Sequence, residues 1–164
     1  MRMLLALILA TLPLTASAGE APQPFTRGTW ALLRQAHRGR PVVVHFWGMT
    51  CGPCLVELPQ WGQFARQEHD VDLVLIDADP APVTLSDIAT TLDKAGLGKA
   101  ESWRFADDFT ERLEYEIDPQ WHGELPYTLL IGRDGTIEPI LGTVDFAQLA
   151  RWSDRQDPAR RTSG

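Results

Sequence analysis

Apolar residues recur along the chain in short runs, and two of these runs are apolar at nearly every position. Val42 to Trp47 reads Val-Val-Val-His-Phe-Trp, and Asp72 to Asp77 reads Asp-Leu-Val-Leu-Ile-Asp. Continuous apolar runs of this length are typical of strands that are buried on both faces of a sheet. Residues 127–131 and 136–141 are predicted to form a hairpin, because the Asp134-Gly135 pair between them favours a tight turn.

Apolar residues at helical spacing predict helices between and around these strands. The residues from Gly19 to Arg27 show no such pattern and are expected to form a loose leader. The predicted helices cover residues 29–37, 51–67, 85–94, 109–116 and 144–152, with a short strand at 103–105. Buried strands that alternate with helices, followed by a hairpin and a closing helix, predict an α/β domain. We expect a central mixed sheet with helices on both faces.

The first 18 residues have the pattern of a signal peptide rather than of a folded element. Met1-Arg2 gives a short positive start, Leu4 to Leu14 is almost wholly apolar, and Ala16-Ser17-Ala18 fits a cleavage site. The apolar stretch is short for a membrane span, although an uncleaved anchor is the alternative. We therefore expect export, most simply to a bacterial periplasm, and no stable membrane insertion after cleavage. The predicted domain is 19–156, with a polar tail at 157–164.

The charge balance makes nucleic acid a poor partner. The 164 residues carry a formal net charge of −7, and the basic residues form no cluster beyond Arg160-Arg161. An acidic balance of this kind favours solubility and does not attract phosphate backbones. Nothing in the sequence indicates an oligomer, so a monomer is expected.

The chain has two cysteines, Cys51 and Cys54, separated by Gly52-Pro53 and placed where a predicted strand meets a predicted helix. At the first helical position, Cys51 would meet backbone N–H groups and the positive end of the helix dipole, which favour the thiolate. Cys54 lies on the same helical face, close enough for a disulfide. Since a disulfide that closes so short a loop stabilises the fold little, the spacing favours thiol–disulfide exchange over a structural role.

Four motifs, spread over residues 42–141, resemble the thioredoxin superfamily and more narrowly its exported TlpA/ResA-like branch. The family patterns are F-W-A-x-W-C-x-x-C, C-x-x-E-x-P, a loop with a cis-proline, and the hairpin after it. Their counterparts are Phe46-Trp47 with Cys51-Gly52-Pro53-Cys54, Cys54 to Pro59, Gly123 to Thr128, and Arg133-Asp134-Gly135. The resemblance implies the thioredoxin-like α/β fold. Thr50 departs from the pattern, because it stands where the family has Trp.

The resemblance also implies a role for each matched position. Cys51 is expected to be the nucleophile that attacks a substrate disulfide, and Cys54 to resolve the mixed disulfide. Pro126 is expected to be cis and to face the two sulfurs, while the backbone of Leu125 binds an extended substrate segment. The other expected substrate contacts are Trp47, Gly52 and Pro53, together with Trp121, for which core packing is the alternative.

Glu57 lies three residues after Cys54 and so on the same helical face. A partly buried carboxylate there would raise thiol pKa values or shuttle a proton, whereas the alternative is a solvated helix residue.

His45 stands where cytoplasmic members of the family have a buried acid, on the side of the strand that carries Trp47. A neutral imidazole would accept the proton of Cys54. An imidazolium would stabilise a thiolate and make the disulfide more oxidising. A core histidine is the third possibility.

The sequence therefore predicts an exported thiol–disulfide oxidoreductase that acts on protein cysteines without a cofactor. The Gly-Pro dipeptide is that of thioredoxin, whose potential of about −270 mV is strongly reducing. A reductase in an oxidising compartment needs an electron supply, which implies a membrane partner of the DsbD/CcdA kind. The client implied by the resemblance is the haem-attachment C-x-x-C of an apocytochrome c.

Two alternatives have different chemistry. The first is a disulfide donor or isomerase that His45 makes oxidising. The second is a Cu(I)-binding protein, since the thiolates of Cys51 and Cys54 suit that ion. His37, His69 and His122 share no metal-ligand spacing and are expected at the surface, so no other metal site is predicted.

Overall fold

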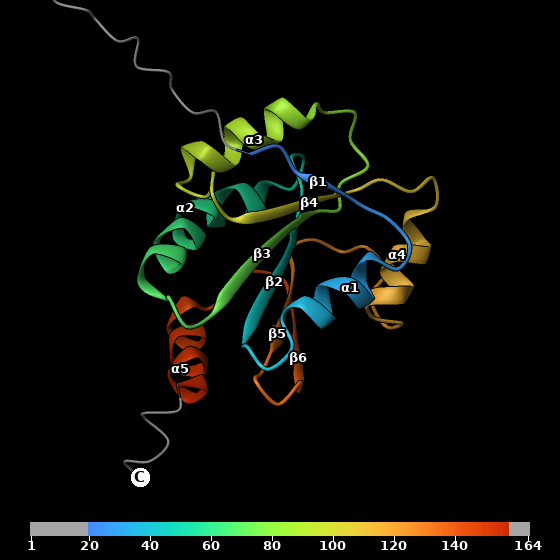
Figure 1. Ribbon diagram of the computed structural model, residues 1–164. Helices are drawn as coiled ribbons and strands as arrows, with labels where there is room; N and C mark the ends of the chain where they lie inside the picture. Colours follow the sequence, from blue (N-terminus) through green and yellow to red (C-terminus); the bar gives the residue numbers. More distant parts are fainter. Residues whose placement is uncertain (1–19, 158–164) are drawn as a thin grey trace, which may run out of the picture.

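The computed structural model describes residues 20–157 (Figure 1). The predicted signal peptide and nearly all of the predicted tail lie outside the described residues. The elements in chain order are β1 (Gln23–Phe25), α1 (Thr29–Ala36), β2 (Val42–Trp47), α2 (Gly52–Gln67), β3 (Asp72–Asp77), α3 (Leu85–Lys94), β4 (Glu101–Phe105), α4 (Thr110–Ile117), β5 (Tyr127–Ile131), β6 (Ile137–Leu141) and α5 (Phe146–Gln156). Within 20–157, no helix has the length and apolar character needed to cross a bilayer.

The strands form one mixed sheet in the order β1-β4-β3-β2-β5-β6. β2 pairs with β3 in parallel and with β5 antiparallel, so the predicted mixed sheet is confirmed. β5 and β6 form the predicted hairpin. β2 is central, and all six of its residues are buried. This burial is the reason that its sequence is apolar without alternation.

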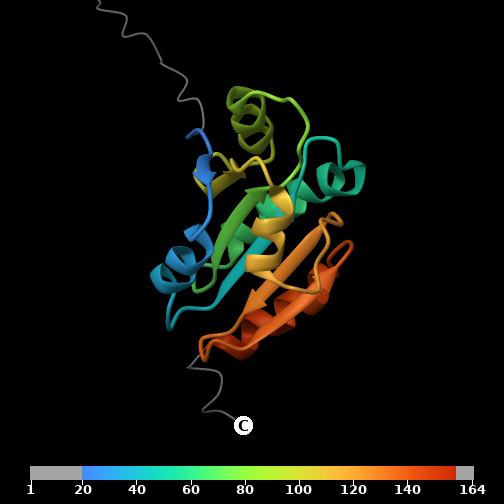
Figure 2. The same cartoon turned by 90° about the vertical axis from the view of Figure 1, so that its right-hand side faces the viewer.

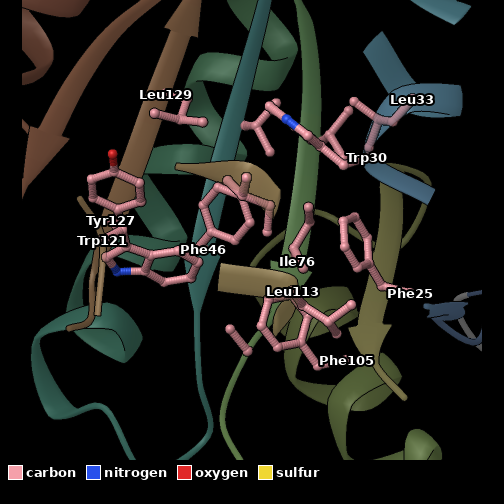
Figure 3. Close-up of a cluster of buried hydrophobic side chains, with 14 of the residues drawn as sticks. Phe25, Trp30, Leu33, Phe46, Ile76, Phe105, Leu113, Trp121, Tyr127 and Leu129 are labelled. Carbon is pink, nitrogen blue, oxygen red and sulfur yellow. The ribbon is translucent and has the colours of Figure 1, made fainter. Parts of the chain in front are cut away.

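The two faces of the sheet carry separate hydrophobic cores because successive β2 side chains point in opposite directions. Val44 and Phe46 belong to the core beneath α1 and α4, which Figure 3 shows in close-up. Val43 and Trp47 belong to the core on the other face, formed with α2, α3 and α5. Figures 1 and 2 show the helices lying on the two sides of the sheet, as the α/β pattern predicted.

The prediction of a loose leader at residues 19–27 is wrong for its central part. Residues 23–25 form β1, which pairs in parallel with β4 and places Phe25 opposite Phe105. Phe25 is fully buried in the core beneath α1. A three-residue edge strand needs only one inward apolar side chain, and so it leaves no periodic pattern in the sequence.

The last helix begins two residues later than predicted and extends further. Asp145 is the N-cap of α5, and its carboxylate accepts hydrogen bonds from the backbone N–H groups of Ala147 and Gln148. This cap satisfies two of the N–H groups that a helix start leaves without an intrahelical partner. The helix therefore starts at Phe146 rather than Val144.

His37 was expected at the surface, but it joins two strands. Its Nδ1 lies 2.8 Å from a carboxylate oxygen of Asp72 in β3, and its Nε2 lies 3.1 Å from one of Glu101 in β4. The hydrogen bond to Glu101 is the largest of the effects that raise the pKa of His37, although burial opposes it. The ring therefore ties the beginnings of two neighbouring strands together.

The parallel strands β2, β3 and β4 end at one edge of the sheet. In register, Trp47 lies opposite Asp77, and Asp77 lies opposite Arg104. The chain leaves β2 at this edge and reaches Cys51 four residues later. In open α/β sheets, functional loops gather beyond the carboxyl ends of the strands, and both cysteines lie there.

Candidate active site

The two cysteines form a disulfide at the start of α2. Their Cα atoms lie 5.2 Å apart, within the usual range for a disulfide. Cys51 was expected at the first helical position, but it is the N-cap, one residue before the helix. The backbone N–H of Cys54 donates to Cys51 Sγ over 3.2 Å. The sulfur of Cys51 therefore takes the place that a Ser or Asp oxygen occupies in a common N-cap.

The two sulfurs differ in exposure. Cys51 is half-buried, whereas Cys54 is fully buried in the core on the α2 side of the sheet. Gly52 and Pro53, between them, are exposed. Pro53 fits the first turn of a helix because the backbone N–H that it lacks has no intrahelical partner there. An incoming substrate can thus reach Cys51 but not Cys54.

Pro126 lies on the loop that enters β5. The Leu125–Pro126 peptide bond is cis, as the family resemblance implied. Phe46 pairs with Tyr127, so the next residue back, Pro126, lies at the end of β2 from which the Cys51 loop leaves. Leu125 is half-buried and packs against both cores. The cis-proline loop and the disulfide therefore occupy the same edge of the sheet.

Two of the expected substrate contacts are wrong. Trp47 is fully buried in the α2-side core, and Trp121 is 4% exposed. The Trp121 ring stacks on Tyr127 with centroids 4.9 Å apart, and its indole N–H donates to the carbonyl of Glu124. The Trp121 ring also contacts Phe46 in the central strand. These contacts place it in the core beneath the cis-proline loop rather than in a substrate groove.

Glu57 is buried, which rules out the solvated-residue alternative. It lies in α2, and its Oε1 accepts a hydrogen bond from the backbone N–H of Val144. Its Oε2 is buried without a hydrogen-bond partner among the described residues. Burial raises the pKa of this carboxyl, although the Val144 N–H partly opposes the shift. Glu57 is therefore a buried carboxyl that is protonated more readily than a solvated one, on the helix that carries Cys54.

His45 is fully buried on the α2 side of β2. Its Nδ1 lies 2.9 Å from Thr128 Oγ1, and its ring packs on Trp61 with centroids 4.6 Å apart. Its Nε2 has no hydrogen-bond partner among the described residues. Burial lowers the pKa of His45 to about 3. The imidazole is thus neutral near pH 7, which argues against the imidazolium alternative.

A second carboxylate at the site, that of Asp79, was not among the residues predicted from the sequence. It lies beyond the end of β3, and Thr50 donates to it with both its backbone N–H and its hydroxyl. Asp79 is 29 residues away from Thr50 in the sequence. The one available signal was the Asp77-Ala78-Asp79 run, which begins at the last residue of a buried strand, at the edge where functional loops gather.

The described part of the chain contains no group of three or more His, Cys, Asp or Glu side chains arranged to hold a metal ion. The chemistry that this arrangement can perform is carried by the sulfur pair itself. The accessible sulfur is that of Cys51 and the buried one is that of Cys54. The buried carboxyl of Glu57 lies in α2, and the neutral imidazole of His45 lies in β2.

The sequence is similar to proteins named thiol-disulfide oxidoreductase ResA. Those of Bacillus thuringiensis and Bacillus anthracis are each 27% identical to it over 124 residues, which cover 74% of this chain. The matched region spans 66% of the length of those relatives. No protein-family model matches the chain.

The fold is that of thioredoxin-like proteins. A secreted disulfide oxidoreductase of Mycobacterium tuberculosis, described as homologous to E. coli DsbE, superposes with a TM-score of 0.59 at 19% identity. The superposition covers 74% of this chain and 85% of that one. A thiol-disulfide isomerase of Corynebacterium glutamicum gives a TM-score of 0.59 at 21% identity, with 75% and 84% of the two chains covered.

Proposed function

This chain has the thioredoxin fold and a ResA/TlpA-like sequence, and we propose that it is a thiol–disulfide oxidoreductase that acts through Cys51 and Cys54. The observation that carries the proposal is the arrangement of the two sulfurs. Cys51 is accessible at the start of α2, whereas Cys54 is buried behind it. This asymmetry suits thiol–disulfide exchange by a pair of cysteines, because one sulfur can meet the substrate while the other meets only its partner.

The reaction proceeds in two exchanges. In the reduced protein, the Cys51 thiolate attacks a substrate disulfide, so that a mixed disulfide forms and one substrate thiolate leaves. Cys54 then loses its proton and attacks Cys51 Sγ, which closes the Cys51–Cys54 disulfide and releases the second substrate thiolate. The substrate gains two electrons and the protein loses two. Glu57 and His45 are the candidate acceptors for the Cys54 proton.

We infer that the reaction runs in the reducing direction. The Gly52-Pro53 dipeptide is that of strongly reducing thioredoxin. The neutral state of His45 supports the same direction, because a buried imidazolium would have favoured the thiolate and an oxidising disulfide. The runner-up is a disulfide donor or isomerase.

The proposed setting is a bacterial periplasm, supported by the signal-peptide pattern of residues 1–18 and by the secreted protein of Mycobacterium tuberculosis with the same fold. The proposed partners are protein disulfides, with the haem-attachment cysteines of an apocytochrome c as one client. The proposed electron donor is a membrane thiol-reducing protein of the DsbD/CcdA kind.

The reduction potential of the Cys51–Cys54 pair tests the proposal. It is measured by equilibration against defined dithiol and glutathione buffers. A value of roughly −250 mV or lower supports a reductase, and one above roughly −180 mV indicates a disulfide donor or isomerase. Activity is tested with insulin as the substrate. Cys51→Ala should abolish insulin reduction, and Cys54→Ala should trap mixed disulfides. Full insulin reduction by Cys51→Ala would contradict the mechanism.

A further inference from the structure

One carboxylate, that of Asp79, accepts three hydrogen bonds directly beside the start of α2. Its Oδ2 lies 2.6 Å from both the backbone nitrogen and the hydroxyl oxygen of Thr50, which immediately precedes Cys51. Its Oδ1 accepts from the backbone N–H of Ala81 over 2.9 Å. Asp79 is 6% exposed. Burial opposes its ionisation, but the hydrogen bonds from Thr50 and Ala81 outweigh burial and lower its pKa.

The loop that carries Asp79 is itself fixed to the sheet. The backbone N–H of Asp79 donates to Asp77 Oδ1 over 3.2 Å. Arg104, which lies opposite Asp77 in β4, donates to the carbonyls of Val83 and Ala81 over 2.8 Å each. The position of Asp79 is therefore set by two strands of the central sheet, and Thr50 is held against a rigid acceptor.

The turn before Cys51 packs closely on the same carboxylate. A Cβ atom added at Gly48 would lie 2.4 Å from Asp79 Cβ, closer than any real contact between such atoms. The backbone N–H of Cys51 donates to the carbonyl of Gly48 over 3.2 Å. Gly48, Thr50 and Asp79 thus form one closely packed unit, and Cys51 is the next residue along the chain.

We propose that Asp79 is a positioning residue for Cys51, and that it acts through Thr50 to hold the turn in the conformation that presents Cys51 Sγ to a substrate disulfide. The inference rests on the proposed thiol–disulfide exchange and adds a residue to it. It also accounts for Thr50, which departs from the Trp of the family pattern and supplies the hydroxyl that Asp79 binds. A thiolate must attack in line with the bond that it breaks, the S–S bond of a disulfide or the C–I bond of iodoacetamide, so a Cys51 that is held less firmly in the attacking position reacts more slowly even when it is fully ionised.

Two substitutions separate the geometry from the charge. Asp79→Asn has nearly the same shape, but its single acceptor oxygen cannot serve Thr50 and Ala81 together, and it removes the negative charge. Thr50→Val removes only the hydroxyl donor, keeping the carboxylate and the backbone N–H donor. Asp70→Asn is the matched control, because Asp70 is an exposed acid before the opposite end of β3.

The experiment measures two reactions of each fully reduced protein from pH 5 to 10. These are the alkylation of Cys51 by iodoacetamide and the reduction of a small disulfide, oxidised glutathione. In both reactions, the plateau rate at high pH, where Cys51 is fully thiolate, should fall at least about fivefold in Asp79→Asn and change in the same direction, by less, in Thr50→Val. The midpoint of the alkylation profile should move to lower pH in Asp79→Asn alone, because only that variant removes a like charge near the thiolate.

Plateau rates within twofold of those of Asp70→Asn in both variants would overturn the proposal. A plateau rate that falls in Asp79→Asn but is unchanged in Thr50→Val would also overturn the proposal, since Asp79 would then not act through Thr50. Insulin reduction by the unmodified protein is assayed separately. Its failure would count against the proposed function, whereas the alkylation comparison still decides the role of Asp79.

Discussion

His45 in β2 and Thr128 in β5 are paired across the sheet, and the imidazole Nδ1 lies 2.9 Å from the threonine Oγ1. Both side chains are fully buried. The pair lies two residues before the end of β2 and two residues after Pro126. It therefore connects the strand that leads to the disulfide with the strand that follows the cis-proline loop.

The low pKa of His45 predicts a loss of stability in acid. Because burial lowers this pKa from 6.5 to about 3, the unfolded chain binds more protons than the folded one between these values. The contribution of His45 to the free energy of unfolding should therefore be complete above pH 6.5 and should decrease as the pH falls. The expected decrease from this residue alone is about 2 kcal/mol between pH 7 and pH 5. Urea unfolding of the unmodified protein and of His45→Asn, compared at each pH, measures this contribution. A difference between the two that does not change with pH would contradict it.

Asp77 should have the opposite effect, over a pH range that lies within that of His45. Burial raises its pKa from 3.8 to about 6, although the Asp79 N–H and Arg104 oppose the shift. The folded state then binds more protons than the unfolded one at this residue, so the contribution of Asp77 to the free energy of unfolding is greatest below pH 3.8 and is lost as the pH rises through about 6. The expected loss from this residue is about 2 kcal/mol between pH 4 and pH 7. Asp77→Asn should lack this loss in the same unfolding series. If the variant keeps the full loss, Asp77 is not the group responsible.

The sequence predicts the buried strands better than it predicts the surroundings of individual side chains. The runs at β2 and β3 were predicted to the residue, because a strand buried on both faces is apolar throughout. Whether an aromatic residue is exposed depends on what packs over it, and so Trp47 and Trp121 were misplaced at the substrate surface. The hydrogen bonds from Thr50 to Asp79 join two loops that come together only because of the order of the strands in the sheet, so no local sequence pattern predicts these bonds.

Glu57→Gln tests the proton-transfer role of the buried carboxyl. Glutamine keeps the size of the side chain and an oxygen that can accept from Val144 N–H, but it cannot take up a proton. We expect the rate of insulin reduction near pH 7 to fall at least about tenfold, less than the roughly 10²–10⁴-fold that general acid–base catalysis usually contributes, because His45 remains as a second candidate acceptor. The urea stability should stay the same or rise slightly, because a buried, partly unpaired carboxylate is removed. An unchanged rate would make Glu57 a packing residue.

Gly48→Ala tests how closely the turn before Cys51 packs on Asp79. The added Cβ would lie 2.4 Å from Asp79 Cβ, so either the turn or the β3–α3 loop must move. Insertion of a methyl group into such a contact typically costs about 1–3 kcal/mol. The matched control is Gly52→Ala at the start of α2, where the added atom meets nothing within 4 Å. Gly48→Ala should lower the free energy of unfolding and slow the alkylation of Cys51, whereas Gly52→Ala should leave stability within about 0.5 kcal/mol of the unmodified protein. Equal free energies of unfolding for the two variants would mean that the turn before Cys51 moves to accommodate the added methyl group without destabilising the fold.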